Sequence, residues 1–189
     1  MANSKKMDFV ILGLLAHESM TGYEIKKRMD TILGFFWNAS YGSIYPTLNE
    51  LQNKQYVTLQ EKKDGGREKK SYTITSEGKE CLERWLHLPV EKDELRYETL
   101  LKLFFGSNTD DSITLQHIEK FEEKIRNQLV VLSAMENSLQ HVLSEEDAHL
   151  NYLLTVTFGI KTYEAYLTWC TQAKNLLSKR AQGNGKVIN

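Results

Sequence analysis

The chain contains only two prolines, Pro46 and Pro89, among 189 residues. Proline interrupts an α-helix because it lacks a backbone N–H and because its ring clashes with the preceding turn. Long uninterrupted helices are therefore possible over most of the chain, and its 41% of hydrophobic residues can supply a packed core. The predicted fold class is mostly α.

Local patterns place several elements in the first half of the chain. A helix is expected at about 8–17, and Thr21 and Glu24 have the spacing of a capping box that begins a second helix. Apolar residues alternate with polar ones at 57–60 and 71–75, which predicts a β-hairpin, and a further helix follows it. With one more helix before the hairpin, this is the element order of the winged helix-turn-helix fold.

The helix before the hairpin has apolar residues four and seven positions after Ile44. It should begin at Gly42 or Ser43, because Pro46 then falls in the first turn, where no intrahelical acceptor is needed. Its other face is small and uncharged at the start and carries Asn49, and asparagine can bind adenine through two hydrogen bonds in the major groove. The alternative is an ordinary solvated helix face.

The tip of the predicted hairpin, residues 62–70, carries five basic and two acidic side chains. A basic finger beside a recognition helix can neutralise DNA phosphates, whereas the alternative is a charged turn that is merely solvated. The residues expected to contact DNA are Lys26, Lys27, Ser40, Tyr41, Gly42, Ser43, Tyr45, Pro46, Asn49, Lys62, Lys63, Arg67, Lys69 and Lys70.

The second half of the chain is expected to form a short apolar helix and two long ones. Apolar residues recur at steps of three and four from Ile118 and again from Leu153. We expect these stripes to join two copies of the chain in a coiled-coil-like dimerisation domain, although an antiparallel hairpin within one chain is the alternative. The residues expected at this contact are Ile118, Phe121, Ile125, Leu132, Leu139, Leu153, Val156, Ile160, Tyr163 and Leu167.

The motifs of the first half resemble those of a known family. They read Leu-Gly-Leu-Leu at 12–15, Thr-Gly-Tyr-Glu-Ile at 21–25, Tyr-Gly-Ser-Ile-Tyr-Pro-Thr-Leu at 41–48 and Gly-Gly-Arg at 65–67. Over about 7–88 the chain resembles the PadR family of bacterial transcription regulators, and the remainder is similar to the longer PadR subfamily. The resemblance implies a homodimeric repressor that binds double-stranded DNA. The expected boundaries are 1–88 for the winged helix-turn-helix DNA-binding domain, 89–181 for the α-helical dimerisation domain and 182–189 for a disordered tail.

The resemblance also implies a small aromatic or phenolic effector, because phenolic effectors are known in this family. We expect it to bind between the winged domain and the helical arm, where apolar walls and a histidine or tyrosine could orient a carboxylate or a phenol. The alternative is that these aromatic residues belong to the core and the dimer interface. The candidates are Trp37, Tyr97, Leu101, Phe104, His149, Tyr152 and Trp169.

Other classes of function find little support in the sequence. It contains no catalytic motif and no metal-ligand spacing, so no enzymatic activity, cofactor or metal is expected. No apolar run approaches the ~18 residues of a membrane helix, and two distant cysteines fit the reducing cytoplasm. The main rival function is a winged-helix module that contacts proteins and shows no salt-dependent binding to DNA. An enzyme within the helical half is a further alternative.

Overall fold

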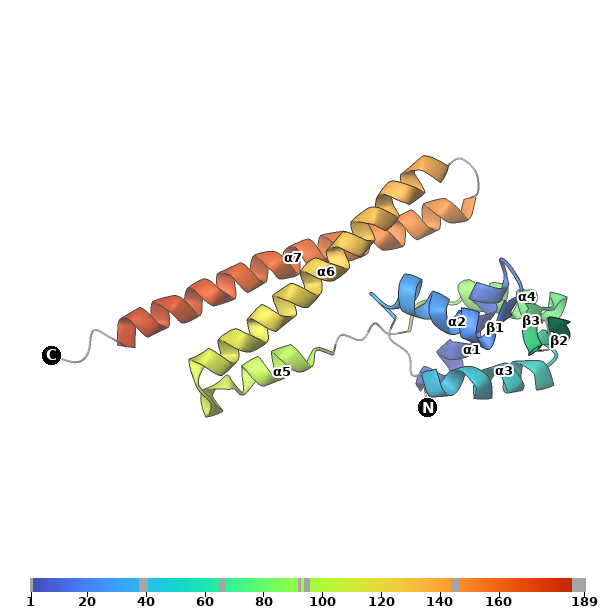
Figure 1. The fold of residues 1–189 in the computed structure, drawn as a ribbon, viewed down its shortest axis with the longest axis horizontal. Helices are drawn as coiled ribbons and strands as arrows, with labels where there is room; N and C mark the ends of the chain where they lie inside the picture. Colours follow the sequence, from blue (N-terminus) through green and yellow to red (C-terminus); the bar gives the residue numbers. More distant parts are fainter. Residues whose placement is uncertain are drawn as a thin grey trace. The chain divides into compact units, whose positions relative to one another are not determined.

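The computed structural model describes residues 2–37, 41–64, 67–91, 93, 96–143 and 147–184. The chain divides into two compact units, residues 1–93 and 94–189, and each is described by itself (Figure 1). The mostly helical fold class is confirmed. The elements of the first unit are α1 (Ala2–Leu15), β1 (Met20–Thr21), α2 (Gly22–Arg28), a π-helical turn (Met29–Leu33), a 3-10 turn (Tyr41–Ser43), α3 (Ile44–Asn53), β2 (Val57–Asp64), β3 (Arg67–Ile74) and α4 (Ser76–Leu86).

Capping motifs begin α2, where the sequence predicts one, and α4. The Thr21 hydroxyl accepts a hydrogen bond from the Glu24 backbone N–H at 3.2 Å, and the Glu24 carboxylate accepts one from the Thr21 N–H at 2.7 Å. The Thr75 hydroxyl accepts from the Gly78 N–H at 3.0 Å. Both motifs satisfy backbone donors that have no partner within the helix.

A three-stranded antiparallel sheet has the order β1-β3-β2. The sequence predicts the β2–β3 hairpin but not β1, which is two residues long and too short to show a period of two. In β1, Met20 pairs with Tyr72 and Thr21 with Ser71. Because Thr21 also caps α2, this edge strand fixes where α2 begins against the hairpin.

The core of the first unit lies between α1, α2, α3 and the sheet. Ile11 and Leu12 of α1 and Leu48 and Leu51 of α3 have no exposed surface. Burying side chains of this size contributes roughly 1.5–3 kcal/mol each to folding. The inner face of α3 is therefore held firmly, which leaves its opposite face in a defined orientation.

The second unit is built on a long helical hairpin. Its elements are α5 (Glu98–Phe104), a 3-10 turn (Gly106–Asn108), α6 (Asp111–Val142) and α7 (Asp147–Asn184). Contacts at both ends show that α6 and α7 are antiparallel. Arg180 forms an ion pair with Asp111 at 3.4 Å, and His149 Nδ1 lies 2.7 Å from the Val142 carbonyl oxygen at the other end. Among the described residues, no helix combines the length and the hydrophobicity needed to cross a membrane.

The predicted apolar stripes pack on each other within one chain. Leu132 is 2% exposed and Ile160 is 6% exposed, although only a single copy is present. The interpretation of these stripes as a contact between two chains is therefore corrected, and the intramolecular hairpin accounts for their burial. The correction applies to the buried residues Ile118, Phe121, Ile125, Leu132, Val156, Ile160 and Tyr163. The half-buried residues Leu139, Leu153 and Leu167 stay a prediction for the contact between two chains. The expected disordered tail is corrected at 182–184, which belong to α7, and 185–189 lie outside the described residues.

A buried carboxylate fixes the register of this hairpin. Glu122 of α6 is 8% exposed and accepts hydrogen bonds from Lys174 Nζ of α7 at 2.5 Å and from Arg126 Nη2 at 2.6 Å. The hydrogen bonds from Lys174 and then Arg126 hold the pKa of Glu122 below its ordinary value. Sliding α6 along α7 would leave this charge buried without its partner, so the ion pair selects one register.

The Glu122→Gln variant is expected to lower the free energy of unfolding at pH 7 by roughly 1.5–3 kcal/mol, because it removes charge-assisted hydrogen bonds and keeps the side-chain shape. A lowered carboxyl pKa stabilises the folded protein above the ordinary value of 4.5, and this contribution is lost as the pH falls below that value. The difference from the wild type should therefore shrink below pH 4.5 in urea unfolding experiments. Glu123→Gln, at the exposed neighbouring residue, is the matched control. Equal stabilities of the wild type and Glu122→Gln at pH 7 would show that the hydrogen bonds of Glu122 do not stabilise the hairpin.

Candidate nucleic-acid interface

The outer face of α3 is exposed and uncharged at its start. Ser43 precedes the helix and Pro46 lies in its first turn, as predicted, and this turn carries no acidic or basic residue. Gly42, Pro46 and Asn49 are exposed, while Ser43 is half-buried. Small residues at this position allow a close approach of the helix start to a ligand backbone, and Asn49 offers both a donor and an acceptor one turn further along.

The far end of α3 is tied to α1. Lys54, directly after the helix, donates to the Asp8 carboxylate at 3.1 Å, and its Nζ lies 4.0 Å from Glu50. The hydrogen bond to Asp8 raises the pKa of Lys54. This positive charge is engaged within the unit. Binding of DNA to the predicted face therefore depends on the polar, uncharged start of α3 and on cations from other elements.

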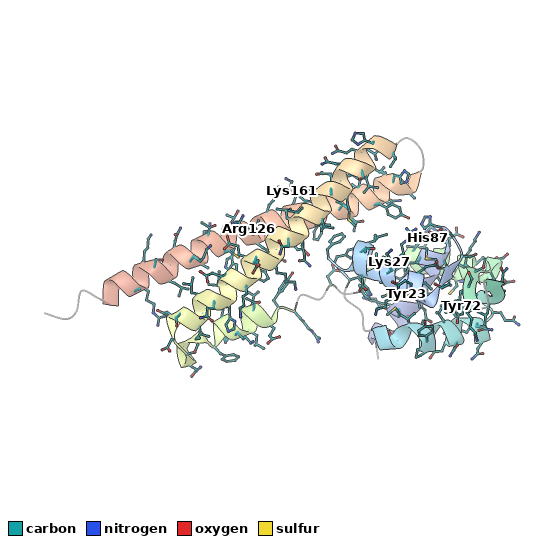
Figure 2. All side chains as sticks on the ribbon, in the orientation of Figure 1. Tyr23, Lys27, Tyr72, His87, Arg126 and Lys161 are labelled. Atoms are coloured by element: carbon teal, nitrogen blue, oxygen red, sulfur yellow. The ribbon has the colours of Figure 1, made fainter. Side chains whose placement is uncertain are left out.

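Helix α2 supplies exposed cations in the same unit. Lys26 and Lys27 are exposed at its C-terminal end, as expected for contacts with a DNA backbone. Tyr23, four residues before Lys27 and therefore on the same side of α2, is 71% exposed (Figure 2). The sequence does not single out Tyr23, since one tyrosine in a capping motif gives no sign of its exposure.

The hairpin brings the predicted basic residues into a defined register. Its pairs are Glu61 with Lys70, Lys62 with Lys69, Lys63 with Glu68 and Asp64 with Arg67. Alternate positions of a strand belong to the same side of a sheet. One set of alternate positions therefore holds three basic residues and one acid, whereas the other set holds two of each. The side chains of 61–69 and the whole of Ser40, a predicted contact, lie outside the described residues, as does the side chain of Tyr41.

Within the second unit, the predicted effector residues do not gather in one place. Tyr97 and Trp169 both contact the ring of Phe121. The centroid of the Phe121 ring lies 5.8 Å from that of Tyr97 and 6.0 Å from that of Trp169. His149 and Tyr152 lie near the start of α7, and the 20 residues from 149 to 169 span about 30 Å of helix. Leu101 and Phe104 are exposed on α5, and Trp37 belongs to the first unit. The expectation of a single cluster is corrected, because a rigid helix separates two of its parts.

The aromatic cluster around Phe121 contains a pair of tyrosine hydroxyls. The Tyr97 and Tyr166 oxygens lie 3.1 Å apart. Burial, together with the hydrogen bond to Tyr166, raises the pKa of Tyr97, so the Tyr97 phenol is neutral near pH 7. One hydroxyl donates to the other, which leaves one hydrogen of the pair to donate to a further acceptor.

The described residues offer no metal site, because nowhere do three or more His, Cys, Asp or Glu side chains converge. Cys81 is half-buried and Cys170 is fully buried, and both are free thiols. Burial raises the pKa of the Cys170 thiol. A thiol of this kind behaves as a small apolar side chain in the hairpin core.

Comparison with known proteins gives matches over both units. Residues 11–84 match the model of the transcriptional regulator PadR-like family, and residues 95–178 match the virulence activator alpha C-terminal family. The negative transcriptional regulator PadR of Bacillus subtilis is 26% identical over 182 residues, covering 92% of this chain and 98% of the relative. The crystal structure of that protein with operator DNA is similar with a TM-score of 0.74, at 27% identity over 90% of this chain and 98% of its own. The structure of the same protein with p-coumaric acid is similar with a TM-score of 0.69, at 25% identity over 91% of this chain and 98% of its own.

Proposed function

We propose that this chain, whose residues 11–84 match the transcriptional regulator PadR-like family, represses transcription in the cytoplasm by binding a two-fold operator as a homodimer. The observation that carries this proposal is the exposed, uncharged start of α3. It lies in the same unit as a β-hairpin whose residues 62–70 include five basic residues. In this proposal the first unit, residues 1–93, binds DNA, and the helices of the second unit, through Asn184 at the end of α7, form the dimer.

Each part of the interface has a distinct role in the proposed complex. The start of α3 enters the major groove, where Asn49 binds a base edge. Lys26 and Lys27 of α2, together with the basic residues of the hairpin, neutralise phosphates and position the domain without reading sequence. Tyr23 joins this group as an exposed hydroxyl donor on the same side of α2 as Lys27.

The dimer contact is assigned to apolar residues that the chain itself leaves exposed. Leu150, Leu154 and Phe158 follow one another at four-residue steps on α7 and are 54%, 60% and 67% exposed. This spacing places them along one side of the helix. The buried stripes between α6 and α7 serve dimerisation indirectly, because they hold the helix that presents these residues.

The effector is a planar phenolic or aromatic acid, the class to which the p-coumaric acid bound by the relative belongs. Tyr97, Tyr166 and Trp169 support this assignment, since they offer aromatic surface and one uncommitted hydroxyl hydrogen. A neutral phenol can donate that hydrogen to a carboxylate or a phenolate. Release of DNA then requires that the ligand prefer the released shape of the dimer.

Titration with p-coumaric acid is expected to quench the fluorescence of the three tryptophans, with at least tenfold weaker affinity when operator DNA is present. Coupling between two ligands is reciprocal, so a ligand that weakens DNA binding must itself bind more weakly to the DNA complex. The Tyr97→Phe variant, which keeps the ring and removes a hydroxyl, should bind the acid more weakly. Identical titrations with and without operator would show that the acid binds but does not regulate DNA binding. If the tryptophan fluorescence is not quenched at all, the aromatic residues form part of the core and do not bind this ligand.

The function itself is tested by sequencing the duplexes that the purified protein retains from a random pool at moderate salt. The expected result is one enriched motif with two-fold symmetry and half-sites about one helical turn apart, bound by two chains. A pool carried through without protein is the control. If no motif is enriched and retention does not depend on salt, the winged-helix unit contacts proteins and this proposal is wrong.

A further inference from the structure

The ring of Tyr45 rests on the first residue of α2. Tyr45 is the second residue of α3 and is 60% exposed, while Gly22 is buried beneath it. A Cβ atom at Gly22 would lie 2.7 Å from Tyr45 Cε1, 2.9 Å from Cζ and 3.0 Å from Oη. Such distances are closer than carbon atoms approach without repulsion. The present position of the tyrosine ring therefore requires that residue 22 have no side chain.

The local backbone gives no other reason for glycine at this position. Gly22 follows the N-cap Thr21 as the first residue of a right-handed helix, and its φ is not in the left-handed region that favours glycine. The capping box uses the side chains of Thr21 and Glu24 and none from residue 22. Glycine is also a poorer helix former than alanine, and the contact with Tyr45 explains why α2 bears this cost.

An added methyl group at residue 22 would move the tyrosine and not the fold. The atoms that it would meet are the far end of a mostly exposed side chain, which can rotate into solvent. The backbone of α3 stays fixed by the buried residues Ile44, Leu48 and Leu51. Gly22 therefore controls the direction of the Tyr45 hydroxyl independently of the position of α3.

We propose that Gly22 is a positioning residue for DNA binding, which seats the Tyr45 ring so that its hydroxyl is held at the DNA-facing start of α3. This inference rests on the proposed function, because it assigns the Tyr45 hydroxyl to a DNA phosphate. A side chain that is already held in its bound direction loses less conformational freedom on binding. Gly22 thus raises affinity without touching the DNA.

The packing itself is tested without DNA by thermal unfolding of four proteins: the wild type, Gly22→Ala, Tyr45→Ala and the double variant. With Tyr45 truncated, Gly22→Ala should raise Tm by about 2 °C through its better helix propensity. With Tyr45 present, the same change should give no gain or lower Tm. Equal Tm shifts in both backgrounds would contradict the contact.

The role in binding is tested with the same four proteins on the selected operator duplex. Gly22→Ala should weaken affinity five- to tenfold when Tyr45 is present and less than twofold in the Tyr45→Ala background. Gly13→Ala in α1 is the matched control, because a Cβ there meets no atom within 4 Å, and it should leave affinity unchanged. Equal losses in both backgrounds, or no loss in either, would overturn the inference.

Failure of this inference can be told apart from failure of the proposed function. If the wild type binds its operator but Tyr45→Ala binds equally well, the tyrosine contact and the role of Gly22 are wrong while DNA binding stands. If the wild type binds no duplex, the proposed function fails, and the unfolding experiment still decides whether Gly22 seats the ring.

Discussion

Placing aspartate at Leu132 is expected to unfold the helical arm, whereas placing it at Phe158 is expected to leave the arm folded and to separate the dimer. Leu132 is 2% exposed between α6 and α7, so the variant loses an apolar contact and buries an unpaired charge. The combined cost is roughly 4 kcal/mol or more, comparable with the stability of a small domain. Phe158 is 67% exposed, and a carboxylate there meets water in a single chain.

Circular dichroism at 222 nm and sedimentation velocity separate the two outcomes. Leu132→Asp should lose much of its helical signal, while Phe158→Asp should keep it and sediment as one chain at concentrations where the wild type sediments as two. Ile160→Asp is the matched control, since it lies two residues from Phe158 but is 6% exposed, and it should behave like Leu132→Asp. A folded, monomeric Leu132→Asp would instead return the buried stripes to the dimer contact, and a dimeric Phe158→Asp would place that contact elsewhere.

The stripes show how far periodicity can be interpreted. A regular three-four spacing from Ile118 and from Leu153 correctly predicts two long helices with one apolar side each. The spacing is the same whether the partner helix belongs to the same chain or to a second copy, because both pack through the same geometry. The identity of the partner depends on the α6–α7 connection and on cross-helix pairs such as Glu122 with Lys174, which periodicity does not encode.

Local chemistry predicts the start of the recognition helix more securely than it predicts the effector site. The cost of proline inside a helix fixes the start of α3 near Ser43, and the capping box fixes that of α2. Residue type alone predicts that the aromatic candidates share one effector site, but Trp169 and His149 are separated by many turns of one helix. Gly22 belongs to the Thr-Gly-Tyr-Glu-Ile motif, but the sequence does not say why this position is glycine. The structure gives the reason, because the Tyr45 ring lies where a Cβ atom of residue 22 would be.

The hairpin and the recognition helix should differ in what they contribute to DNA binding. Arg67→Ala removes one expected phosphate contact, so it should weaken binding to operator and random duplex alike and reduce the slope of log affinity against log salt by about 0.9. Asn49→Ala should leave the slope unchanged and lower the ratio of operator to random affinity about tenfold, as expected when a bidentate base contact worth roughly 1–3 kcal/mol is lost.

Affinities measured at four salt concentrations on operator and random duplexes give, for each variant, the slope of log affinity against log salt and the ratio of operator to random affinity. Glu50→Ala is the control for the recognition helix, because Glu50 is the exposed neighbour of Asn49 and its removal deletes no expected base contact. If Asn49→Ala lowers both affinities by the same factor, its base-reading role is wrong. If Arg67→Ala leaves the slope of log affinity against log salt unchanged, the hairpin does not contact phosphates through Arg67. Sequence discrimination would then rest on α3, and the basic residues of α2 would carry the salt dependence.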